Sequence, residues 1–155
     1  MSLIITGLSP EPFRPLFALS DAELAAAGIV RRTVDAKPGF PCRITLEDAE
    51  PGETVLLLAY EHQPAASPYR AGGPIFVREA AAERARAAGT VPEYLASRLL
   101  SVRAYDDAGM MVEAEVVDGR ELEPLAGRFL ARPDVAYLHV HFARRGCYAA
   151  RIDRA

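Results

Sequence analysis

The segment that decides the fold is residues 137–148, which read YLHVHFARRGCY. Its first six residues alternate in character, and such alternation is typical of a β-strand with two different faces. Tyr137, His139 and His141 then lie on one face, and the apolar residues between them lie on the other. The letters ARRG that follow indicate a turn into a return strand. The segment therefore predicts an antiparallel hairpin with a polar, reactive face backed by an apolar one.

The rest of the chain predicts further strands and a few short helices. Alternating or apolar runs predict strands at 3–5, 29–34, 42–46, 54–60, 75–78, 100–105 and 110–117. The run 54–60 contains so little polar residue that we expect it in the middle of a sheet, covered on both faces. Capping and propensity signals predict helices at 20–28, 80–88, 92–95 and 122–130. We expect an α+β fold with mainly antiparallel sheet and three or four short helices, forming a single globular domain over residues 1–155.

Composition excludes several classes of protein. The chain has 155 residues, is 50% hydrophobic and carries a formal net charge of −3. An acidic chain without a basic tail is not typical of proteins that bind nucleic acid or anionic membranes, so neither partner is expected. No signal peptide and no long apolar run are apparent, which predicts a cytoplasmic location. Cys42 and Cys147 form no CxxC pair, which excludes a zinc ribbon, and a disulfide between them is disfavoured in a reducing compartment.

The two histidines of the hairpin could act together. On a strand, His139 and His141 have Cα atoms about 7 Å apart and point the same way, so both could bind one metal ion. Such a site needs a further ligand, and the candidates are Cys147, His62 or an acidic residue from another strand. The alternative is that one histidine bonds a neighbouring strand and the other is exposed. The sequence therefore identifies neither a metal nor any other cofactor.

The register of the hairpin decides whether Cys147 joins the histidines. A three-residue loop at 144–146 would pair Ala143 with Cys147 and place the thiol on the histidine face, where it could act as a nucleophile with His139 or His141 as base. A four-residue loop would pair Phe142 with Cys147 and bury the thiol in the core. Both registers remain open.

Arginines inside predicted strands form a third pattern. Arg43, Arg78 and Arg103 alternate with apolar residues, so they project from sheet faces and would form an anion pocket if they converge. Arg70, which precedes two glycines, and Tyr137 on the histidine face are further candidates for ligand binding. Arginines that pair with acidic residues on a solvated sheet face would give the same pattern.

Several short motifs together resemble a bacterial family known as domain of unknown function 1203. The motifs that carry this resemblance are Cys42-Arg43, Pro51-Gly52-Glu53, Tyr69-Arg70, Gly73–Arg78, Ser101–Tyr105, His139–His141 and Gly146–Arg151. The resemblance spans nearly the whole chain and implies a small bacterial domain. It implies no activity, substrate or catalytic residue.

Residues 137–143 are also similar to the strand of histidine-triad nucleotide hydrolases, with Tyr137 in place of the first histidine. That likeness would make His139 the nucleophile and His141 its partner, but it covers seven residues only. The function that the sequence favours is binding of a small acidic ligand or anion at a pocket lined by histidine, arginine and cysteine. The alternatives are a small hydrolase that uses Cys147 or a histidine-bound metal, and a structural or interaction domain. Whether the chain is an enzyme, and its oligomeric state, stay open.

Overall fold

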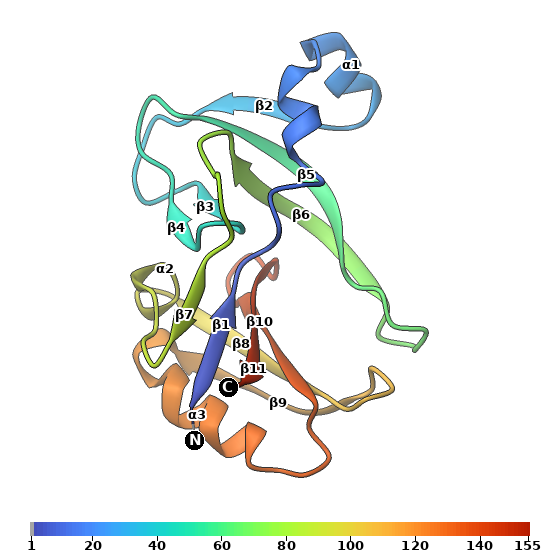
Figure 1. Cartoon of the computed structure of the whole chain (residues 1–155), viewed down its shortest axis with the longest axis vertical. Helices are drawn as coiled ribbons and strands as arrows, with labels where there is room; N and C mark the ends of the chain where they lie inside the picture. The colour runs from blue at the N-terminus through green and yellow to red at the C-terminus, as the bar shows by residue number, and fades with distance from the viewer. Residues whose placement is uncertain (1) are drawn as a thin grey trace.

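Two β-sheets, one above the other in Figure 1, make up most of the computed structural model, which describes residues 2–155. The larger sheet has six antiparallel strands in the order β7 (Arg86–Ala88), β1 (Leu3–Thr6), β11 (Tyr148–Arg154), β10 (Tyr137–Phe142), β8 (Leu99–Tyr105) and β9 (Met111–Asp118). The smaller sheet has five strands in the order β2 (Val30–Thr33), β5 (Thr54–Gln63), β6 (Ala71–Arg78), β3 (Pro41–Cys42) and β4 (Glu47–Asp48). Only the contact between β3 and β6 is parallel within the described residues.

Short helices pack around the two sheets. Those described are η1 (Arg14–Ala18), α1 (Asp21–Ala26), α2 (Glu93–Ala96), η2 (Gly119–Glu121) and α3 (Leu122–Leu130), where η denotes a 3-10 helix. The capping box at the start of α1 is present as predicted, because Glu23 N donates to Ser20 Oγ and Ser20 N donates to Glu23 Oε1. None of the helices within residues 2–155 has the length and apolar character needed to cross a membrane.

The two faces of the larger sheet have different neighbours. On one face, Leu138, Val140 and Phe142 of β10 join the main hydrophobic core, to which α3 contributes Leu125 and Phe129. On the other face, His139 and His141 point toward the end of β5. The far end of the long strand β5 therefore covers the histidine face, and the histidines lie between the two sheets.

The structure confirms the mainly antiparallel α+β class and the antiparallel hairpin predicted for residues 137–148. The predicted helix over 80–88 is wrong, because this segment forms a loop and then β7, which pairs with β1. Ala85 and Ala87 pack against the main core there, so tertiary packing outweighs the helix propensity of an alanine-rich segment. The predicted strand over 42–46 is also wrong beyond Cys42, because the chain turns and Leu46 adopts a positive φ of 53°. The single domain stays a prediction.

A close approach at Gly7 joins the two sheets. Gly7 N donates to Ala85 O, and a Cβ at this position would lie 2.1 Å from Ile44 O. Gly7→Ala is therefore expected to lower the free energy of unfolding by about 3 kcal/mol, because backbone would have to move. Denaturant unfolding checks this value. Gly127→Ala in α3 is the control, since nothing lies within 4 Å of its Cβ position, and it should leave stability unchanged or raise it by about 1 kcal/mol.

Candidate functional site

Three histidines meet between the sheets. His139 and His141 on β10 are 3% and 1% exposed, and His62 near the end of β5 is half-buried. The ring centroid of His62 lies 4.8 Å from that of His141 and 6.1 Å from that of His139. One ring nitrogen from each histidine lies within 4.8 Å of the other two. This group, the histidine cluster, offers three nitrogen donors of the kind that bind transition metals.

Aromatic residues and arginines surround the histidine cluster. Tyr148 of β11 stacks on His62 with ring centroids 5.5 Å apart, and Gln63 Nε2 donates to Tyr137 Oη over 2.9 Å. Arg103 of β8 and Arg151 of β11 lie opposite His139 in the strand register. Tyr137 therefore belongs to the wall of this cluster, where the Arg151 guanidinium lies 4.2 Å from its ring centroid.

The surroundings keep the histidines neutral. Burial, together with the nearby His141, His62 and arginines, lowers the pKa of His139 to about 3. Burial also lowers the pKa of His141 to about 4, although the hydrogen bond to Gly146 O opposes this shift. Burial lowers the pKa of His62 as well, with a smaller effect from Arg103. Neutral imidazole is the form that binds a metal ion.

Cys147 lies away from the histidine cluster. Phe142 N donates to Cys147 O, so the loop has four residues, and an extra residue, Ala149, forms a bulge where His141 pairs with Tyr148. The register that would place Cys147 on the histidine face is therefore wrong. Its Sγ accepts a hydrogen bond from Arg43 Nη2 over 3.0 Å. No histidine bonds this thiol within residues 2–155, so the predicted cysteine–histidine pair is not formed.

The structure does not bring the candidate arginines together. Arg78 bonds Glu53 and Glu47, and Arg70, in the loop between β5 and β6, bonds Glu61 of β5. Arg103 lies on the histidine face, whereas Arg43 lies on the far side of the hairpin. Both cysteines are free thiols, and Cys42 is buried in the smaller sheet. The condition for an anion pocket of Arg43, Arg78 and Arg103 is therefore not met, and Arg78 instead shows the alternative pairing with acidic residues.

A different group of arginines does converge, in a cleft of about 1040 Å³ between the two sheets. We call it the basic cleft, because its lining includes five arginines and one acidic residue, Asp118. The arginines are Arg32, Arg43, Arg98, Arg144 and Arg145. Phe40, Phe76 and Phe142 also line it, together with Cys147.

Two of these arginines are held by the protein. Arg43 is 2% exposed and donates to Tyr148 O and Pro41 O, and its guanidinium carbon lies 5.1 Å from the ring centroid of Phe142. Arg98 pairs with Asp48 through both terminal nitrogens. Arg43 thus places a fixed positive charge in the wall of the basic cleft, whereas Asp48 balances the charge of Arg98.

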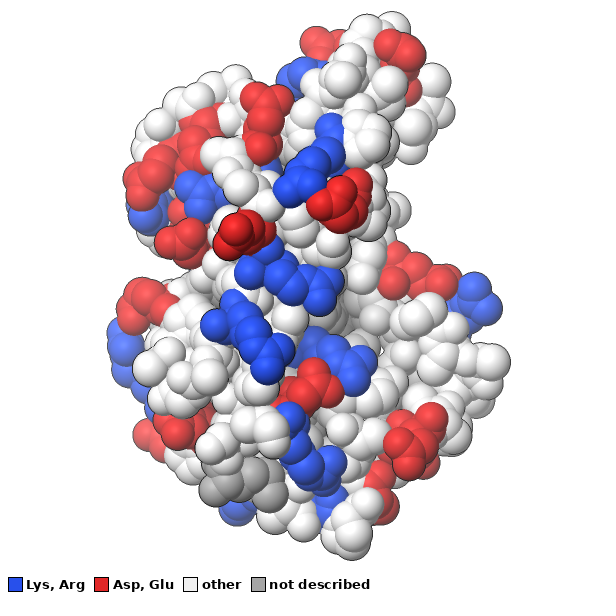
Figure 2. Space-filling model, viewed as in Figure 1, with Lys and Arg blue, Asp and Glu red and all other residues white. Residues whose placement is uncertain are grey.

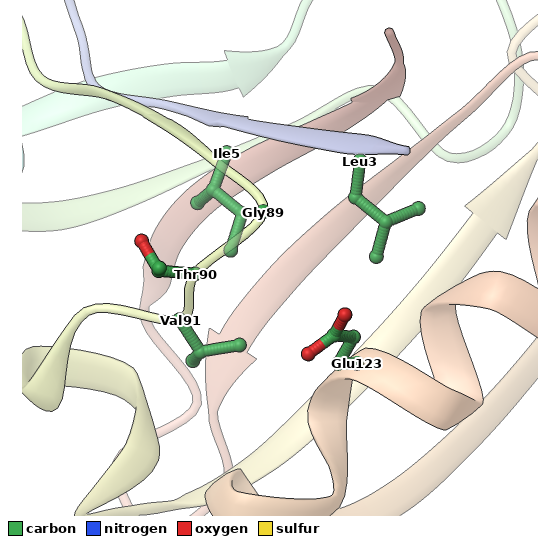
Figure 3. Close-up of a pocket in the computed structure, with 6 residues that line it drawn as sticks. All are labelled: Leu3, Ile5, Gly89, Thr90, Val91 and Glu123. Atoms are coloured by element: carbon green, nitrogen blue, oxygen red, sulfur yellow. The ribbon is translucent and has the colours of Figure 1, made fainter. Parts of the chain in front are cut away.

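Two other regions of the described residues are less suited to a ligand. On the face drawn in Figure 2, basic side chains gather around the narrow middle of the molecule, but acidic side chains lie among them. The pocket in Figure 3 lies between β1 and α3 and has a volume of about 10 Å³, with Leu3, Ile5 and Val91 in its lining. This is about the least space that can hold one water molecule, so the pocket is too small for a ligand.

The sequence offered partial signals for these two groups. His62 is one of its candidate ligands, but only the crossing of β5 over the larger sheet places it against β10. Arg144 and Arg145 stand out in the hairpin turn, whereas Arg32 and Arg98 carry no local mark of a site. Their convergence depends on how the two sheets pack, which no sequence spacing reveals.

Fold and site define a two-sheet α+β protein with a basic cleft and a histidine cluster between its sheets. The chain belongs to the family described as Protein of unknown function (DUF1203), whose model matches residues 39–154. This confirms the resemblance seen in the sequence. The matched range includes all three histidines and every residue that lines the basic cleft except Arg32. No curated protein and no solved structure matches the chain.

Proposed function

We propose that the protein binds a small acidic ligand in the basic cleft. The observation that carries the proposal is the lining of five arginines against one acidic residue, in a chain whose net charge is −3. A cleft with one sign of charge concentrates ligands of the opposite sign, and low-dielectric walls strengthen the attraction. Arginine suits this role because its planar fork binds carboxylate and phosphate with two parallel hydrogen bonds.

Three of the five arginines are available to a ligand. Arg32, Arg144 and Arg145 are exposed and have no ion pair in the part of the chain that the structure describes. Arg32 belongs to the smaller sheet, and Arg144 and Arg145 belong to the turn that joins β10 and β11. An anion in the cleft would therefore contact both sheets at once.

The lining also favours a ligand with an apolar part. Phe40 and Phe76 pack with ring centroids 5.1 Å apart, and Leu57, Pro41 and Pro74 lie beside them in the cleft. Binding sites commonly combine an apolar lining with a few charged groups that orient the ligand. We infer a ligand that carries phosphate or carboxylate groups on an apolar or aromatic body. Phenyl phosphate is the simplest probe with both features.

Loss of two free arginines should weaken this binding. The double variant R144Q/R145Q is expected to bind phenyl phosphate at least tenfold more weakly than the natural chain, because each charge-assisted hydrogen bond contributes about 1.5 to 3 kcal/mol. Isothermal titration calorimetry at low and at physiological salt measures the two affinities. Higher salt should weaken the natural chain more than the variant, because screening acts on the lost charges.

A control variant distinguishes the loss of contacts in the cleft from a general loss of positive charge. Arg128 is exposed on α3 and lies outside the cleft lining, so Arg128→Gln removes one positive charge elsewhere. Its affinity for phenyl phosphate should equal that of the natural chain. Absence of measurable binding by the natural chain, or an equal loss in Arg128→Gln, would overturn the proposed function.

A further inference from the structure

The histidine cluster contains three buried nitrogens that no protein atom satisfies. His62 Nδ1, His139 Nδ1 and His141 Nε2 are each inaccessible to solvent and have no hydrogen-bond partner. A buried polar atom without a partner costs about 1 to 3 kcal/mol, so three on neighbouring rings need an explanation. Each histidine contributes one of them, and the three rings are mutual neighbours. The pattern indicates a group that would occupy the space between them.

The hydrogen bonding of His141 determines which of its nitrogens is free. Its Nδ1 lies 2.9 Å from Gly146 O, and a carbonyl oxygen only accepts, so Nδ1 carries the proton. Nε2 is then a free lone pair, and it is the nitrogen left without a partner. Metal-binding histidines commonly donate their other nitrogen to a carbonyl in this way, which fixes the ring and its tautomer. Gly146 comes from the same hairpin turn, so the strand register holds His141 in position.

The spacing of the rings is slightly wider than the coordination of a small metal ion requires. A tetrahedral zinc ion with nitrogen ligands at about 2 Å holds those atoms about 3.3 Å apart. The three donors lie within 4.8 Å of one another, so the rings need to move inward by about 1 Å or less. Half-buried His62 leaves the cluster open on its side, which provides a route for entry.

We propose that His62, His139 and His141 bind one divalent transition-metal ion, best matched by zinc, and leave one position open for water or an anionic group. Three neutral imidazoles with an open fourth position form a donor set typical of zinc. Arg103 and Arg151 flank His139 and repel a cation, but they favour an anion at the open position.

Metal titration tests this proposal. Protein without a histidine tag, stripped with a chelator, is titrated with zinc against a chromophoric competitor, and one equivalent should bind. His62→Gln should weaken zinc binding by more than the roughly 100-fold upper range typical for a residue that only supports a ligand. Half-buried His62 is the mildest position to change, and far-UV circular dichroism checks that the variant folds. Failure of the natural chain to bind zinc, or unchanged affinity in a folded His62→Gln, would overturn the proposal.

A cysteine variant gives a second, spectroscopic readout. Cobalt(II) in the natural chain should show the visible bands of a four-coordinate ion, and His62→Cys should retain binding and add a sulfur-to-cobalt charge-transfer band. Absence of that band in cobalt-loaded His62→Cys contradicts direct coordination at this position. Cys147→Ser and R144Q/R145Q should both bind zinc as the natural chain does, because their side chains lie outside the cluster. A loss in Cys147→Ser would place the metal elsewhere.

Discussion

Arg43→Ala is expected to lower the free energy of unfolding by about 4 kcal/mol, the sum of lost hydrogen bonds and a new cavity. The side chain is 2% exposed, and its Nε and Nη1 donate to Tyr148 O and Pro41 O over 2.8 and 2.7 Å. Alanine would leave both carbonyls without this partner and would empty the space beside Phe142. Denaturant unfolding followed by circular dichroism measures the change.

Two further variants help to interpret the loss of stability in Arg43→Ala. Arg43→Lys keeps the charge but cannot reproduce the planar fork, so it should recover part of the stability only. Arg120→Ala is the control, because the exposed Arg120 side chain pairs with exposed Glu93, and its effect should stay within about 0.5 kcal/mol. A loss below about 0.5 kcal/mol in Arg43→Ala would contradict its structural role, since ordinary surface changes cost as much.

Acidification is expected to destabilise the metal-free protein by about 3 kcal/mol between pH 7 and pH 5, because the folded state excludes protons that the unfolded state binds. The pKa values of His139 and His141 are about 3 and about 4 in the folded protein, against 6.5 for an ordinary histidine. The two histidines therefore contribute fully to the free energy of unfolding above pH 6.5. This contribution is lost as the pH falls from 6.5 toward their pKa values in the folded protein. His62 adds to the effect in the same direction.

The charged groups around the histidines also favour a loss of stability as the pH falls. His62 of β5, Arg103 of β8 and Arg151 of β11 face His139, and each disfavours a proton on it. Unfolding by denaturant in the presence of a chelator, at pH 7.5, 6 and 5, measures the slope. His141→Gln should reduce the slope by about half, since one of the two most buried titrating groups is removed. Equal stability at all three pH values would show that the histidines are solvated.

The hairpin of β10 and β11 shows which features of the site the sequence predicts and which it does not. Alternation along residues 137–142 predicts one face for His139 and His141 and another for Phe142, and the structure confirms both. The face of the hairpin on which Cys147 lies depends on the loop length and on the bulge at Ala149. Neither feature can be predicted from the alternation of residues. Local patterns therefore identify the histidine face but not the position of the thiol.

Contacts between distant elements account for what the sequence does not predict. Residues 86–88 form a strand because β1 is there to pair with them, despite a composition typical of a helix. His62 meets His141 only because β5 continues past its own sheet. Arg32 and Arg145 line one cleft although they lie more than a hundred residues apart in the chain. Such contacts arise from the packing of the two sheets, and no periodicity of the sequence encodes them.

Tyr148 connects the two candidate sites. Its ring stacks on His62 on one side of β11, and its carbonyl oxygen accepts a hydrogen bond from Arg43 on the side of the basic cleft. The histidine cluster and the basic cleft thus lie on opposite faces of one hairpin. Their proposed ligands are tested separately, because the free arginines of the cleft do not contact the histidines.

The proposed acidic ligand binds between the sheets, at the free arginines. The most direct measurement is the Nε–Hε nuclear magnetic resonance spectrum of the arginine side chains during a titration with phenyl phosphate. Signals of Arg32, Arg144 and Arg145 should shift together and saturate, while those of Arg128 and Arg120 should stay in place. Absence of any shift, or equal shifts for arginines outside the cleft, would contradict the claim.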